Sequence, residues 1–88
     1  MTTKMNNKQR KTLTAIFNKP SPKTLEWTEI ESLIKALGGQ INHHQGSKVR
    51  IELNNISLNI HSPHPQKEVK QYVVRLLKEF LEKAGVTP

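Results

Sequence analysis

The histidines are the side chains of this sequence best suited to proton transfer near neutral pH, and its four histidines form two pairs. His61 and His64 flank Ser62-Pro63, where prolines would hold both imidazoles on a rigid turn. We treat them as candidate general acid/base residues. The alternative, which has equal weight, is that the two imidazoles only form hydrogen bonds with the backbone of the turn. His43 and His44 end a short polar run, and exposed polar side chains near a strand end are the commoner explanation for them.

Metal and cofactor chemistry is not favoured. Neither histidine pair has an acidic companion, and no His-x-x-x-His spacing occurs. The chain has no cysteine, which excludes disulfides, thiolate ligands and a cysteine nucleophile. A glycine-rich phosphate loop and a Gly-x-Ser-x-Gly motif are also missing. We therefore expect no metal and no small-molecule cofactor.

A second candidate site consists of Gly46, Ser47, Lys48 and Arg50. Lys48 and Arg50 share one face of a predicted strand, which places the two cations about 6 to 7 Å apart, near the spacing of successive phosphates. Either cation could instead pair with Glu52. Because no predicted element is offered to a major groove, the pattern suits RNA better than DNA.

The net charge of +7 is concentrated near the N-terminus. Residues 1–25 hold six bases and no acid, or +6, whereas residues 26–88 hold eight bases and seven acids, or +1. A basic arm of this kind commonly binds phosphate backbones or an acidic protein. The alternative is that it serves only as a solubilising tail.

Two helices are predicted before the candidate residues. Apolar residues at spacings of three and four predict a helix of about two turns from Arg10, which Asn18–Pro22 ends. A second helix is predicted to begin at Thr28, where Glu31 has the spacing of a capping box, and to end at Gly38-Gly39.

Three strands and a last helix follow. A short run over 40–44 precedes two alternating runs over 48–53 and 56–61, which Asn54-Asn55 joins as a hairpin turn. A long amphipathic helix is predicted from Glu68, with a glycine as its C-cap.

These elements predict an α+β domain in which two long helices pack on the apolar face of a three-stranded antiparallel sheet. The polar face is then left for solvent or a ligand. We divide the chain into residues 1–25, a basic arm with a short helix and a proline-containing linker, and residues 26–88, the folded domain. Whether the first helix packs on that domain or reaches a partner is left open.

No segment approaches the roughly 18 consecutive apolar residues of a membrane span, and no secretory signal is visible. We expect a cytoplasmic protein without membrane contact.

Four ordered motifs carry a resemblance to a known family. They are Trp27-x-x-Ile30-Glu31-x-Leu33-x-x-x-Leu37-Gly38-Gly39, Gln45-Gly46-Ser47, His61-Ser62-Pro63-His64-Pro65 and Leu81-Glu82-Lys83-Ala84-Gly85-Val86. Over about residues 27–86 the chain resembles the HicA family of type II toxin-antitoxin toxins, as a longer branch with an extra N-terminal helix.

The resemblance implies a fold like that of a double-stranded-RNA-binding domain, α-β-β-β-α. It also implies an mRNA interferase that needs no metal and is held inactive by a HicB antitoxin. The family pattern has a catalytic histidine directly after Gly-Ser, where this sequence has Lys48. A lysine at its usual pKa stabilises charge and is no base at pH 7.

If this chain still cleaves RNA, the resemblance implies that His61 or His64 is the general base that takes the proton of the ribose 2′-OH. Lys48 and Arg50 would then stabilise the negative charge of the phosphorane. We expect His64 to matter more, because it lies on the constrained turn. The alternatives are a non-catalytic RNA-binding relative that has lost the base and a plain protein-interaction domain.

Overall fold

The computed structural model describes residues 5–19, 25–44, 46–63 and 67–88. Its elements in chain order are α1 (Asn7–Phe17), α2 (Trp27–Ala36), β1 (Gln40–His43), β2 (Lys48–Leu53), β3 (Ile56–His61) and α3 (Gln71–Lys83). The strands form one antiparallel sheet in the order β1-β2-β3. The predicted α+β class and the order helix, three strands, helix are confirmed.

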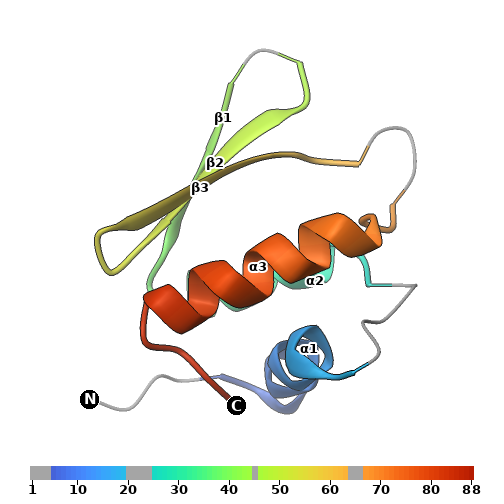
Figure 1. Cartoon of the computed structure of the whole chain (residues 1–88), viewed down its shortest axis with the longest axis vertical. Coiled ribbons are helices and arrows are strands. Elements are labelled where there is room, and N and C mark those ends of the chain that lie inside the picture. Colours follow the sequence, from blue (N-terminus) through green and yellow to red (C-terminus); the bar gives the residue numbers. More distant parts are fainter. Residues whose placement is uncertain (1–4, 20–24, 45, 64–66) are drawn as a thin grey trace.

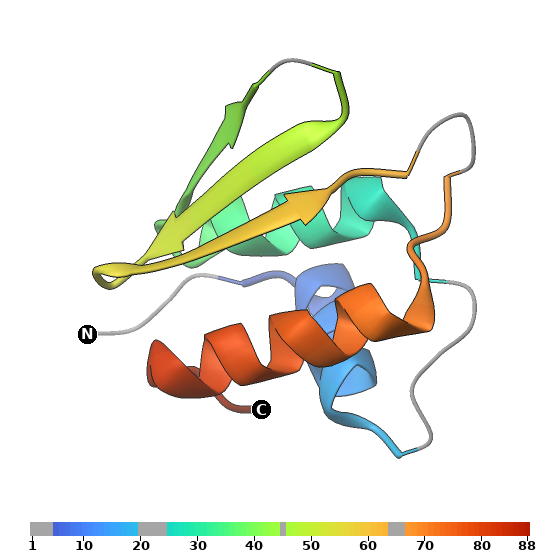
Figure 2. The ribbon, with the colours of Figure 1, turned by 45° about the horizontal axis from the view of Figure 1, so that its top comes forward.

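The elements form three layers. Helices α2 and α3 lie side by side on one face of the sheet, and α1 crosses beneath them on the side away from the sheet (Figures 1 and 2). Leu13 and Ile16 of α1 are 3% and 1% exposed and belong to the same buried cluster as the residues between the sheet and the two long helices. The first helix therefore packs on the domain, which the sequence had left open.

The hairpin between β2 and β3 forms as its sequence predicts. Asn54 and Asn55 have φ angles of 50° and 66°, the positive values that a two-residue turn of this kind requires. The Asn54 side chain also donates a hydrogen bond to the carbonyl of Ala84 (2.8 Å), just after α3. The turn thereby fixes the register between β2 and β3 and holds this end of the hairpin against the C-terminal end of α3.

The two glycines after α2 have different roles. Gly38 has a φ of 87°, the left-handed conformation in which glycine ends a helix without penalty. Gly39 instead makes a close approach, because a Cβ there would lie 2.8 Å from the carbonyl oxygen of Glu52 and 2.8 Å from Cγ2 of Ile34. The absence of a side chain at Gly39 lets the chain pass between α2 and the sheet.

The predicted start of α2 is wrong in detail. The capping arrangement lies two residues earlier than Thr28 and Glu31, with Glu26 as the N-cap, and the Glu26 N–H donates to Oε1 of Glu29 (3.0 Å). Thr28 lies inside the helix.

The last helix also begins later than predicted, at Gln71 instead of Glu68. An antiparallel bridge pairs Glu26 with Glu68, and the Val69 N–H donates to the Leu25 carbonyl (2.9 Å). Because residues in extended pairing cannot also be helical, this bridge sets the start of both long helices.

Candidate nucleic-acid-binding face

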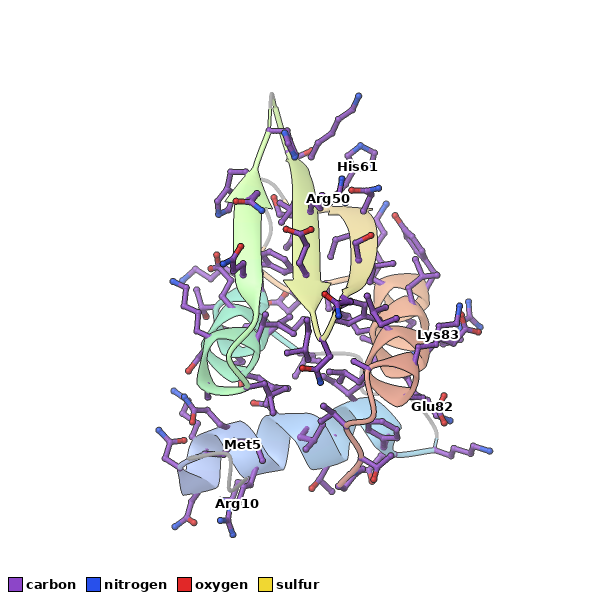
Figure 3. The ribbon with its side chains drawn as sticks, turned by 90° about the vertical axis from the view of Figure 1, so that its left-hand side faces the viewer. Met5, Arg10, Arg50, His61, Glu82 and Lys83 are labelled. Carbon is purple, nitrogen blue, oxygen red and sulfur yellow. The ribbon has the colours of Figure 1, made fainter. Side chains whose placement is uncertain are left out.

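The sheet has an exposed side that faces away from the helices, and Figure 3 looks onto it with Arg50 and His61 labelled. Alternation along the strands places polar residues there, whereas the apolar residues of β2 point to the helices. We call this side the polar sheet face. Its residues are Gln40, Asn42, His44, Lys48, Arg50, Glu52, Ser57, Asn59 and His61.

Lys48 lies between two histidines on this face. His61 is its direct partner on β3. On the other side, the His44 N–H donates to the Lys48 carbonyl (2.9 Å), which continues the pairing of β1 with β2 by one residue. Because directly paired residues of neighbouring strands project to the same side, His44, Lys48 and His61 form one row across the sheet.

A cavity of about 330 Å³ adjoins this row, a volume at the lower end of the range for small-ligand sites. His44, Lys48 and His61 all line it, and Val49, Asn59 and Ile60 complete the lining. All three row residues are exposed. The row can therefore offer two imidazoles and an ammonium group to one bound phosphodiester.

Arg50 lies on the same face but pairs with Glu52, as one sequence alternative allowed. Its guanidinium nitrogen is 3.5 Å from Oε2 of Glu52, and the amide of Asn42 donates to Oε1 of the same carboxylate (3.4 Å). The side chains of Arg50 and Glu52 are 46% and 42% exposed. Because such exposed pairs contribute at most about 1 kcal/mol, a phosphate can take the place of Glu52 at low cost.

Gly46 and Ser47 lie beside the row at the end of the sheet. Gly46 is exposed with a φ of 67°, so its turn favours glycine. The Ser47 carbonyl accepts hydrogen bonds from the Ser62 N–H (2.8 Å) and from Oγ of Ser62 (3.3 Å). These bonds hold the end of β3 against the start of β2 and so fix the pairing of His61 with Lys48.

The structure thus brings together Gly46, Ser47, Lys48 and His61. Arg50 lies two residues beyond Lys48 on the same face of β2. The predicted site residue His64 lies outside the described residues.

His43 and His44 are adjacent in sequence but lie on opposite faces of the sheet. Nε2 of His43 is 3.6 Å from Oε2 of Glu31 on α2, which covers the other face. Sequence reasoning treated the two residues alike and so missed His44. The alternation of the strand could have distinguished them. If the predicted strand is extended to His44, that residue lies on the same face as Gln40 and Asn42, whereas His43 lies on the opposite face.

Among the described residues, no helix combines the length and the apolar character that a membrane crossing needs.

The fold and this face define a small α-β-β-β-α domain with an exposed polar sheet face that carries Lys48 and Arg50. Helix α1 is added to this domain. A family model described as HicA toxin of bacterial toxin-antitoxin systems matches residues 27–86. The chain belongs to this family, which indicates that its partner is an antitoxin. Searches among curated proteins and among solved structures gave no match. Helix α1 lies outside the matched residues.

Proposed function

We propose that this toxin is an mRNA interferase, an endoribonuclease that cleaves transcripts without a metal ion. The observation that carries the proposal is the direct cross-strand pairing of Lys48 with His61 on an exposed face, at the position after Gly-Ser. An ammonium group and an imidazole side by side are the groups that transphosphorylation of RNA needs, a charge stabiliser and a proton acceptor.

In the proposed mechanism the imidazole of His61, the last residue of β3, or that of His64 takes the proton of the ribose 2′-OH. The 2′-oxygen then attacks the adjacent phosphorus, and Lys48 and Arg50 stabilise the negative charge of the phosphorane. Arg50 becomes available when the phosphate displaces Glu52, its partner 3.5 Å away in the free protein. The pairing with Lys48 supports His61 as the base, while His64 stays a prediction from the sequence.

Alanine substitutions test these roles. We expect His61→Ala or His64→Ala to lower transcript cleavage by about 100-fold or more, the usual contribution of a general base, and to relieve growth arrest on expression in bacteria. His43→Ala is the matched control, because His43 faces α2 and not the polar sheet face. Full toxicity of both single variants would remove these two imidazoles from the mechanism.

A second candidate function is a non-catalytic RNA-binding relative of the family. Lys48 favours it, since a lysine stands where the family resemblance implies the catalytic histidine. Incubation of the purified protein with RNA in EDTA separates the two functions. Cleavage products without metal support the nuclease, whereas a salt-sensitive mobility shift without products supports the RNA-binding protein.

We also propose that the antitoxin is HicB-like and inactivates the toxin by covering the polar sheet face. If it does, Lys48 should be protected from amine-reactive labelling in the complex, while Lys8, an exposed lysine of α1, should be labelled as in the free toxin. Equal labelling of Lys48 in both states would contradict this mode of inhibition.

A further inference from the structure

We infer that His44 is a catalytic residue, the general acid that protonates the leaving oxygen during RNA cleavage. The inference rests on the proposed nuclease function and adds His44, the residue directly after β1, to which the sequence patterns gave no catalytic role. Its basis is the row His44, Lys48, His61 and the cavity that all three residues line.

The order of the groups in the row suits the reaction. In an in-line displacement at phosphorus, the attacking and leaving oxygens lie on opposite sides of the phosphorus atom. The base and the acid must therefore approach from opposite sides, with the charge stabiliser between them. His61 and His44 are separated by two strand spacings, about 9 to 10 Å between backbones, and Lys48 occupies the middle strand.

The imidazole of His44 is also available for this role. It is exposed, and among the described residues it has no hydrogen bond or ion pair. The nearest carboxylate of β2, that of Glu52, is held by Arg50 and Asn42, while Glu31 of α2 contacts His43 on the other face. His44 therefore lines the cavity beside Lys48 without another side-chain partner among the described residues.

The step balances without a co-reactant. His61 accepts the 2′-OH proton, the bond from the 2′-oxygen to phosphorus forms, and the bond from phosphorus to the 5′-oxygen breaks. Protonated His44 gives its proton to that 5′-oxygen. The products are a 2′,3′-cyclic phosphate and a 5′-hydroxyl, and the two imidazoles have exchanged protonation states.

Two substrates distinguish an acid from a base or a structural residue. The first is an RNA oligonucleotide, whose 5′-alkoxide leaves poorly without a proton. The second is a nucleoside 3′-(p-nitrophenyl phosphate), whose phenolate leaves without one. For His44→Ala we expect kcat on RNA to fall by about 100-fold or more, with KM unchanged, and kcat on the nitrophenyl ester to stay within a few-fold of that of the unsubstituted toxin.

His43→Ala is the control and should cleave both substrates as the unsubstituted toxin does, with the far-ultraviolet circular dichroism of both variants unchanged. An equal loss on both substrates, or no loss on RNA, would overturn the role of His44 and leave the nuclease function standing. Failure of the unsubstituted toxin to cleave either substrate would instead overturn the proposed function and this inference with it.

Discussion

Replacement of Ile16 by alanine tests whether α1 is a structural layer of the domain. Ile16 is 1% exposed and packs in the common core, although α1 lies outside the family match. Truncation of a fully buried isoleucine to alanine costs about 2 to 5 kcal/mol, because apolar contacts are lost and a cavity remains. For a domain of this size, a loss of about 3 kcal/mol lowers Tm by roughly 12 to 24 °C.

Thermal unfolding followed by circular dichroism measures this effect. Thr14→Ala is the matched control, since Thr14 is exposed on the same helix and alanine favours helix, so its Tm should change by no more than about 4 °C. If Ile16→Ala unfolds at the same temperature as the unsubstituted protein, α1 is a dispensable arm and its place in the core is refuted.

Three further substitutions test the sheet. Gly39→Ala should destabilise the fold by about 1 to 3 kcal/mol in urea unfolding, because the new Cβ meets the Glu52 carbonyl at 2.8 Å, and an unchanged midpoint would contradict that close approach. Lys48→Ala should make the salt dependence of RNA binding shallower by about 0.7 in the slope of log K against log salt, the value for one lost contact to single-stranded phosphate; an unchanged slope would place the RNA elsewhere. Glu52→Gln should tighten RNA binding at low salt by up to about fivefold, because it frees Arg50 from an exposed ion pair, whereas unchanged or weaker binding would show that Arg50 takes no part.

Local sequence determined much of this fold. The hairpin was predictable because alternation along 48–53 and 56–61 and the tolerance of Asn54-Asn55 for positive φ agree on one register. The first residues of α2 and α3 were not predictable, because the bridge between Glu26 and Glu68 joins segments that are far apart in the chain. The apolar edge of α1 indicated burial, but the surface that buries it is built from α2 and α3.

The candidate site was predictable to a similar degree. Lys48, Arg50 and His61 could be assigned to the exposed side, since strand phase alone fixes which way they point. The proposed role of His44 required the pairing of β1 with β2, because that register places His44, the residue directly after β1, opposite Lys48. Residues 40–44 contain one aliphatic residue, Ile41, so their hydrophobic pattern is too weak to predict that register from the sequence.

The chemistry of the RNA ends after incubation with purified toxin in EDTA shows directly whether the ribose 2′-oxygen is the nucleophile. We predict fragments with a 2′,3′-cyclic phosphate or its hydrolysed 3′-phosphate on one side of the cut and a 5′-hydroxyl on the other. Intact RNA, or fragments with a 3′-hydroxyl and a 5′-phosphate, would contradict attack by the ribose 2′-oxygen and with it the proposed roles of the sheet imidazoles.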